Sequence, residues 1–115
     1  MVSCMKKFFL FLTFVLVLLV GCSKKNMRED IVLPREDDVI VDVRTKAEYD
    51  DLHIKKAINI PYDEIDENVQ LDKTKRVFVY CKSGARSRKA YNILKELGYN
   101  VIDLGSIDSI SLEKE

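Results

Sequence analysis

Residues that bind metals or form disulfide frameworks are scarce in this chain of 115 residues. It has one histidine, three cysteines and no tryptophan. A protein metal site usually needs a cluster of about three or four Cys, His or acidic ligands, so the sequence predicts no metal and no organic cofactor. The chain also has no excess of positive or negative charge, since 19 Lys and Arg balance 19 Asp and Glu. This balance argues against a general nucleic-acid-binding protein.

The sequence also has no apolar run long enough to span a membrane. The apolar run near the N-terminus, residues 8–20, has thirteen residues, includes Thr13 and follows two lysines. Thirteen helical residues extend about 20 Å, whereas the hydrocarbon core of a bilayer is about 30 Å thick. A basic start followed by a short apolar stretch is typical of a secretory signal peptide and not of a permanent membrane span. An uncleaved N-terminal helix is the alternative.

The residues that end this run, Leu-Val-Gly-Cys at 19–22, resemble the bacterial lipobox. The resemblance implies cleavage before Cys22 and attachment of diacylglycerol to its thiol. We therefore expect a lipoprotein that is exported and held on a cell membrane by its lipid. The expected parts are a signal peptide over residues 1–21, a polar tether over residues 22–30 and a folded domain over residues 31–115.

The three cysteines have separate fates under this interpretation. Cys4 is removed with the signal peptide and Cys22 carries the lipid, so Cys81 is the one free thiol expected in the mature chain, and an internal disulfide framework is excluded. An unpaired thiol in an exported protein calls for an explanation, and chemical reactivity provides one. The mature chain keeps 17 basic and 19 acidic residues, a net charge near −2.

Cys81 follows four apolar or aromatic residues and opens the run Cys-Lys-Ser-Gly-Ala-Arg at 81–86. A thiol at the end of a buried strand, followed by a short loop with a glycine and two cations and then by a helix start, predicts an anion-binding cradle built around a nucleophile. The backbone N–H groups of such a loop and the positive end of the helix favour the reactive thiolate. Lys82 and Arg86 would add to this positive field. The alternative is that Cys81 is a small buried hydrophobe.

Hydrophobic patterns alternate between strand and helix along the rest of the chain. Apolar and β-branched runs predict strands at residues 39–43, 57–60, 76–80 and 99–104. The spacing of Thr45 and Glu48 predicts a capping box and a short helix over residues 45–51, and an apolar stripe predicts a helix over residues 87–97. This alternation predicts an α/β fold with a small, mainly parallel sheet flanked by helices on both faces. Cys81 would lie at the carboxyl end of a strand, where active residues of such sheets gather.

Three segments resemble the signatures of the rhodanese-like sulfurtransferases. Residues 42–44, Asp-Val-Arg, together with Glu48 are similar to the first signature of that family, and residues 53–61 are similar to the second. Residues 81–87, Cys-Lys-Ser-Gly-Ala-Arg-Ser, resemble the catalytic loop of its single-domain members. The order and spacing of the three segments extend the likeness over residues 39–110, nearly the whole predicted domain.

The resemblance implies a sulfurtransferase in which the Cys81 thiolate attacks the outer sulfur of a small anionic donor such as thiosulfate and becomes a persulfide. A thiol or cyanide then accepts this sulfur. Backbone N–H groups of the loop would hold the terminal sulfur and the departing anion, while Arg86, with Lys82, would hold the anionic end of the donor. The implied substrate-binding residues are Lys82, Ser83, Gly84, Ala85, Arg86 and Ser87. Helix capping is an equally good role for Ser87.

Four polar residues are candidates for a catalytic network: Asp42, Arg44, Glu48 and His53. In the family that the chain resembles, these positions hold the loops around the sheet by hydrogen bonds and ion pairs, so we expect them to be structural support. A thiolate that its cradle already ionises needs no general base, which makes direct catalysis by His53 the weaker interpretation.

Two other functions stay open at this point. A non-enzymatic persulfide carrier or sulfur-sensing module would use the same cysteine without steady turnover. A cysteine phosphatase or arsenate reductase would use a similar scaffold, but those phosphatases place five residues between nucleophile and arginine, and only four separate Cys81 from Arg86. The smaller ring suits a sulfur atom better than a tetrahedral phosphate.

The chain departs from the family pattern at several turns. Leu52 and Lys56 stand where glycine is usual, so we expect the turns around His53 to form without the usual freedom at positive φ. Ser106 and Ile110 stand where a second glycine and often a tryptophan are usual. The segments that flank the predicted domain are brief, so we expect the first edge strand and the final helix of the family to be reduced or absent.

Overall fold

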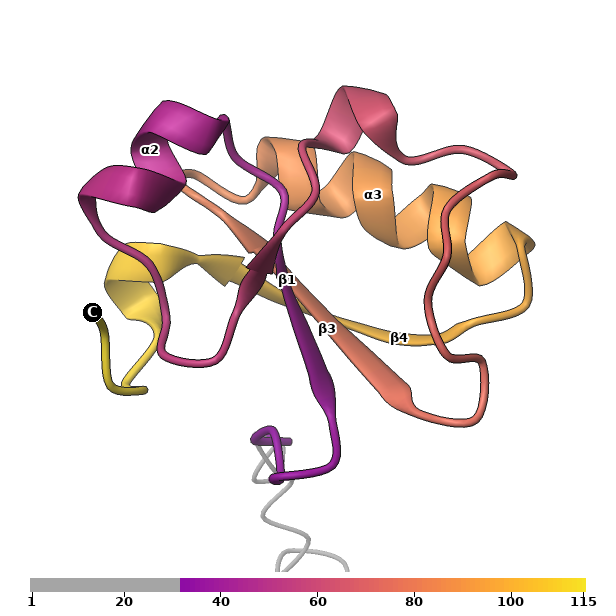
Figure 1. Ribbon diagram of the computed structural model, residues 1–115, viewed down its shortest axis with the longest axis horizontal. Helices are drawn as coiled ribbons and strands as arrows, with labels where there is room; N and C mark the ends of the chain where they lie inside the picture. The colour runs from indigo at the N-terminus through magenta and orange to yellow at the C-terminus, as the bar shows by residue number, and fades with distance from the viewer. Residues whose placement is uncertain (1–31) are drawn as a thin grey trace, which may run out of the picture. The chain divides into compact units, whose positions relative to one another are not determined.

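The computed structural model describes residues 32–115 of the chain (Figure 1). The predicted signal peptide, the predicted lipidation site Cys22 and the predicted tether all lie outside the described residues. Leu33–Glu115 form a unit of their own. Within residues 32–115, no helix combines the length and the apolar character that crossing a membrane requires.

Strands and helices alternate along the described chain, as the hydrophobic pattern predicts. In chain order the elements are β1 (Val39–Asp42), α2 (Lys46–Asp51), β2 (Ile58–Asn59), the 3-10 helix η1 (Tyr62–Glu64), β3 (Arg76–Cys81), α3 (Ala85–Glu96), β4 (Asn100–Ser106) and the 3-10 helix η2 (Ile107–Ser109).

The four strands form one sheet in the order β2-β1-β3-β4, and every neighbouring pair is parallel. All strands therefore end at the same edge of the sheet. Figure 1 shows α2 and the start of α3 at this edge. The register between β3 and β4 shifts between Val79 and Tyr80, so that Cys81 pairs with Ser106. An irregularity of this kind re-aims the end of a strand, here directly beside Cys81.

The sheet buries side chains on both faces, because residues along a strand point alternately to either side. One face packs against α3, and the buried residues there include Val41, Val77, Val79, Cys81, Ala90 and Leu94. The other face is covered by the segment after α2 and by η2, and its buried residues include Ile40, Ile54, Phe78, Tyr80, Ile107 and Ile110. Tyr49 of α2 packs against this second cluster. The predicted α/β fold is confirmed.

Two boundaries differ from the prediction at the point that matters for function. Cys81 is the last residue of β3 rather than the first residue after the strand. The helix α3 begins at Ala85, whereas the predicted helix begins at residue 87. Gly84 occupies the N-cap position with φ 94, a left-handed conformation that glycine adopts without steric cost. The helix therefore begins two residues before the start that the apolar pattern predicts.

The turns around His53 form without glycine, and one of them still uses a positive φ. Lys56 adopts φ 71, so a lysine takes the left-handed conformation for which glycine is usual. Leu52 has φ −159, an ordinary extended conformation. Within residues 32–115, the chain after β4 ends in η2 and a short antiparallel pairing of Ile54 with Lys114, and no further helix follows.

Candidate functional site

The candidate site is the loop that joins β3 to α3. The strand buries its last five residues completely, and Cys81 ends it with no exposed surface. Only three residues, numbers 82–84, separate Cys81 from the first residue of α3. Because this connection is so short, the first N–H groups of the helix converge on the space beside the cysteine sulfur.

The Cys81 sulfur lies among hydrogen-bond donors and acceptors of the loop. The backbone N–H of Gly84 donates to Sγ with an N···S distance of 2.9 Å. The thiol in turn lies 3.5 Å from the hydroxyl oxygen of Ser87, and this hydroxyl donates to the Gly84 carbonyl at 3.1 Å. Ser87 is fully buried and belongs to the first turn of α3. The loop therefore surrounds the sulfur with hydrogen bonds, while the anion-binding role predicted from the sequence stays a prediction.

Two opposing effects act on the pKa of the Cys81 thiol. Burial raises it, because a buried charge loses its hydration. Hydrogen bonds from the Ser87 hydroxyl and from the backbone N–H groups of Ser87, Gly84 and Ser83 lower it, and together they hold the pKa below its usual value. The site thus favours the thiolate, which is the nucleophilic form of cysteine.

Neighbouring backbone fixes the shape of the loop. The hydroxyl of Ser106, at the end of β4, donates to the backbone carbonyl of Lys82. Gly84 packs close to Gly105, and a Cβ on Gly84 would lie 3.9 Å from the Gly105 Cα. Sequence reasoning noted Ser106 only as a departure from a family glycine. The pairing of Ser106 with Cys81 in the sheet register, which the sequence pattern does not contain, is what brings it to the loop.

Arg86 is paired with Glu48 across the edge of the sheet. Its Nη1 donates to Oε1 at 2.8 Å and its Nη2 donates to Oε2 at 3.1 Å. Hydrogen bonding to Arg86 lowers the pKa of Glu48 to about 2. Thr45 caps α2 and also donates to the Glu48 carboxylate, so the predicted capping box is confirmed. Arg86 is therefore already paired with a carboxylate, and its predicted role in holding the donor anion stays a prediction.

The other predicted loop residues lie where the sequence places them, around the cradle. Lys82 and Ser83 are exposed, and Ala85 is exposed in the first turn of α3. Ser83 contributes its backbone N–H to the field at the sulfur. The substrate-binding roles of these residues stay predictions.

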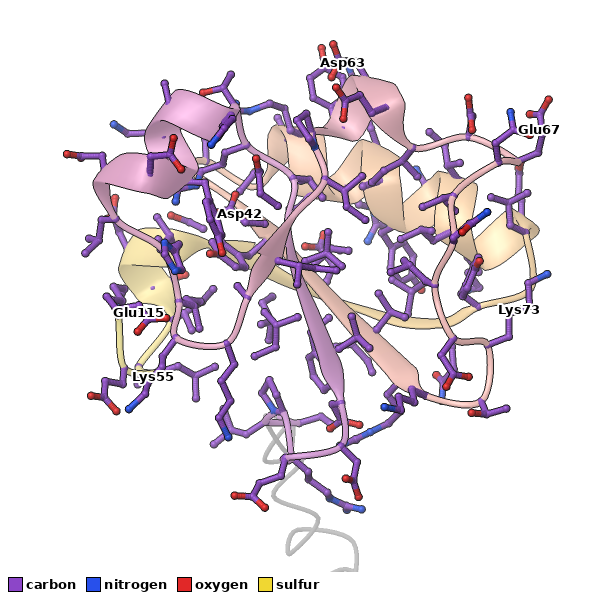
Figure 2. All side chains as sticks on the ribbon, in the orientation of Figure 1. Asp42, Lys55, Asp63, Glu67, Lys73 and Glu115 are labelled. Atoms are coloured by element: carbon purple, nitrogen blue, oxygen red, sulfur yellow. The ribbon has the colours of Figure 1, made fainter. Side chains whose placement is uncertain are left out.

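Asp42 and Arg44 form a buried ion pair that supports the sheet. The Nη2 of Arg44 lies 2.7 Å from Oδ2 of Asp42, and the backbone N–H of Arg44 donates to Oδ1 at 2.9 Å. The hydroxyl of Tyr80 also donates to Oδ2, at 2.8 Å, and accepts from the backbone N–H of Ile54 at 3.0 Å. Figure 2 shows Asp42 inside the fold, near α2. Asp42 and Tyr80 point to the face of the sheet opposite Cys81.

Sequence reasoning missed the polar role of Tyr80. In the pattern it is one of four apolar or aromatic residues of a buried strand, and nothing nearby in sequence indicates a partner for its hydroxyl. Burial raises the pKa of this hydroxyl far above its usual value, so it stays protonated and keeps donating to Asp42.

His53 contacts the C-terminal segment and not the loop of Cys81. Its ring stacks on Tyr49 at a centroid distance of 3.9 Å, and Nδ1 lies 2.8 Å from the Tyr49 carbonyl oxygen. A carbonyl oxygen only accepts, so Nδ1 carries the hydrogen. Nε2 lies 3.4 Å from a carboxylate oxygen of Glu115. Figure 2 shows Glu115 and Lys55 together at this end of the chain.

A cleft of about 200 Å³ lies away from the Cys81 loop. Its floor includes Ile40 and Ile54, which belong to the buried cluster on the sheet face opposite Cys81. The remaining lining residues are Pro34, Arg35, Glu36, Lys55, Lys56, Leu112 and Glu113. Within residues 32–115, no group of three or more His, Cys, Asp or Glu is arranged to hold a metal ion.

A parallel α/β sheet with a cysteine cradle at the end of its third strand defines a class of protein, and comparison with known families assigns the chain to that class. The rhodanese-like domain family matches residues 24–112, which is most of the sequence. The chain belongs to the rhodanese-like domain family.

Individual relatives are similar over most of the described part. The chain is 38% identical to the thiosulfate sulfurtransferase PspE of Escherichia coli over 78 residues, which is 64% of this chain and 75% of PspE. A solved structure titled "rhodanese with anions from E. coli" superposes with a TM-score of 0.62 at 35% identity, over 68% of this chain and 96% of that one. The "Putative sulfur carrier protein YrkF" of Bacillus subtilis is 31% identical over 64 residues, which is 55% of this chain and 35% of YrkF.

Proposed function

We propose that this protein is a sulfurtransferase that moves a sulfane sulfur from a small anionic donor to a thiol or cyanide through a persulfide on Cys81. The observation that carries the proposal is the set of hydrogen bonds around the Cys81 sulfur, which lowers the pKa of a thiol at the carboxyl end of a central strand. The similarity to PspE, a thiosulfate sulfurtransferase, supports thiosulfate as the donor.

In the first half-reaction the Cys81 thiolate attacks the outer sulfur of thiosulfate. A sulfur–sulfur bond forms to Cys81, the sulfur–sulfur bond of the donor breaks, and its electron pair leaves with sulfite. The N–H of Gly84, which now donates to Sγ, is placed to stabilise the negative charge on the persulfide, as an oxyanion hole does for oxygen. No proton has to be removed from a thiol that is already ionised.

In the second half-reaction the acceptor attacks the outer sulfur of the persulfide. With cyanide the product is thiocyanate, and with a thiolate it is a new persulfide; in both cases the electron pair of the broken bond returns to Cys81 as thiolate. Cys81 is the one free cysteine among residues 32–115. Within these residues, no second thiol is available to accept the sulfur.

The test combines mass and turnover. After incubation with thiosulfate, the intact mass of the protein should increase by one sulfur atom, and sulfite should appear in equal amount. With cyanide present, thiocyanate should form repeatedly. Cys81→Ser should abolish both signals, whereas Asp50→Asn, a change at an exposed residue of α2, should leave both intact. If the wild-type protein neither gains a sulfur atom nor releases sulfite, the proposal is wrong.

A persulfide carrier is the second candidate, and the similarity to a sulfur carrier protein favours it. The complete burial of Cys81 also fits slow exchange with small acceptors. The two functions differ in one measurement. A carrier gains one sulfur per chain and releases one sulfite in a single burst, whereas an enzyme continues to produce thiocyanate at a steady rate.

We also propose that the chain is exported and anchored to a cell membrane through a lipid on Cys22. The lipobox-like residues 19–22 support this proposal. Expression in a bacterium with labelled palmitate should give a labelled protein in the membrane fraction. Cys22→Ala should lose the label, whereas Cys4→Ala should keep it. A soluble, unlabelled wild-type protein with its N-terminus intact would contradict the proposal.

A further inference from the structure

Arg86, a cation beside the Cys81 loop, is already paired with a carboxylate of the same protein. Both terminal nitrogens of Arg86 donate to the Glu48 carboxylate, one to each oxygen. The two residues are 38 positions apart in sequence, and the pair joins the first turn of α3 to α2. A bidentate pair between a guanidinium and a carboxylate uses the same face of Arg86 that would bind an oxyanion.

The electrostatic influence of this pair extends to the nucleophile. Hydrogen bonding to Glu48 is the main reason that the pKa of Arg86 is raised, and the negative charge of the Cys81 thiolate contributes as well. While Glu48 is in place, its carboxylate cancels much of the attraction that Arg86 offers to an incoming anion.

The cradle is closed in this arrangement. Cys81 and Ser87 have no exposed surface, so a donor cannot reach the sulfur without movement of the loop. Arg86 lies between Ala85 and Ser87 in the first turn of α3, and its bond to Glu48 restrains that turn. The pair itself is accessible, since the side chains of Arg86 and Glu48 are 26% and 29% exposed. Ion pairs with this much exposure contribute only about 0.2–1 kcal/mol, so this pair opens at a small cost in free energy.

We propose that Glu48 is a specificity-determining residue that occupies Arg86, so that it keeps the Cys81 cradle closed and weakens the preference for anionic sulfur donors that a free Arg86 would give. The donor class rests on the proposed sulfur transfer, whereas the closing of the cradle by Glu48 does not. Both anionic and neutral donors require the ion pair to open. An anionic donor also has to compete with the Glu48 carboxylate for Arg86.

The chain offers a matched control on the same helix. Asp50 forms an ion pair with Lys46 at 2.9 Å, and both side chains are mostly exposed. Asp50→Asn therefore removes one carboxylate charge from α2 and breaks one ion pair, as Glu48→Gln does, but it leaves Arg86 untouched. Any difference between the two variants reports on the contact with Arg86.

The first experiment measures access to Cys81 with iodoacetamide, a neutral reagent that reports on the thiol whether or not the protein transfers sulfur. Rates are compared on the high-pH plateau of each variant, where the thiol is fully ionised. Glu48→Gln should be alkylated about two- to five-fold faster than the wild type, a factor that matches the strength of a partly exposed ion pair. Asp50→Asn should react at the wild-type rate.

The second experiment measures kcat/KM for thiosulfate and for dimethyl trisulfide, a neutral sulfane donor. Glu48→Gln should lower the KM for thiosulfate and raise kcat/KM for thiosulfate by a larger factor than for the neutral donor, so that the preference for the anion rises. A raised KM for thiosulfate, or equal alkylation rates in Glu48→Gln and the wild type, would overturn the proposal. Faster alkylation without sulfur transfer in any variant would instead overturn the proposed function and leave the role of Glu48 in place.

Loss of the folded state in Glu48→Gln would be visible as a lost thermal transition. Glu48→Asp then takes its place, because it keeps the charge on α2 but is too short to retain both hydrogen bonds to Arg86. It should be alkylated faster than the wild type as well. An unchanged rate in this variant also counts against the proposal.

Discussion

Ser87→Ala tests the link between the cradle and the reactivity of Cys81. In the protonated state the Ser87 hydroxyl donates to the Gly84 carbonyl and lies 3.5 Å from the thiol. When the thiol ionises, the hydroxyl can turn toward the sulfur and donate to a charge. The variant removes this response and leaves the backbone donors of the loop in place.

The magnitude follows from the exchange of one hydrogen bond for another. A hydrogen bond to a charged group contributes about 1.5–3 kcal/mol and a neutral one about 0.5–1.5 kcal/mol. Turning from the Gly84 carbonyl to the thiolate therefore favours ionisation by about 1–1.5 kcal/mol. Since one pKa unit corresponds to about 1.4 kcal/mol, Ser87→Ala should raise the pKa of the Cys81 thiol by about one unit.

The assay is the pH dependence of alkylation by iodoacetamide, with the thiolate absorbance in the ultraviolet as a second measure. The wild-type midpoint should lie below that of free cysteine, because the hydrogen bonds of the loop outweigh the effect of burial. Ser83→Ala is the control, since Ser83 acts through its backbone N–H, which alanine keeps. The reasoning fails if both variants shift the midpoint equally, or if Ser87→Ala shifts it by less than the error of the fit.

Four further outcomes are expected. Tyr80→Phe removes two buried hydrogen bonds, one of them to a carboxylate, and should lower the free energy of unfolding in urea by about 2–4 kcal/mol. Gly84→Ala forces an L-residue to φ 94 and should cost about 1–2 kcal/mol in the same assay, with slower alkylation. Arg86→Ala should reduce kcat/KM for thiosulfate more than the exposed Arg88→Ala does, and equal losses would contradict the geometry. The pKa of Glu48 is depressed from 4.5 to about 2, so its stabilisation is complete above about pH 4.5 and is lost as the pH falls through 2; acid unfolding of Glu48→Gln should lack this component.

Several parts of the fold follow from short stretches of sequence. Apolar β-branched runs predict the positions of β1 and β3, and the spacing of Thr45 and Glu48 predicts the start of α2, which the capping hydrogen bonds confirm. These signals are local, because strand periodicity and helix capping involve residues only a few positions apart. The order of residues 81–87 likewise predicts a loop that closes around a sulfur atom.

Other features escape local patterns. The start of α3 at Ala85 depends on the conformation of Gly84, and glycine is compatible with many turns. Lys56 shows the converse, since a lysine adopts φ 71 at a turn, a conformation that its residue type does not predict. Neither conformation is encoded in the hydrophobic pattern from which the elements are predicted.

The candidate nucleophile Cys81, the loop around it and the alternation of strands and helices can be inferred from the order of residues alone, since each depends on neighbours in sequence. The partners of the polar residues cannot. Asp42 meets Tyr80, and Glu48 meets Arg86, across the same separation of 38 residues. These contacts exist because β1 lies beside β3 in one particular register and because α2 and α3 meet at the shared edge of the sheet. The ion pair between Arg86 and Glu48 is therefore a property of the assembled fold, and the order of residues alone does not predict it.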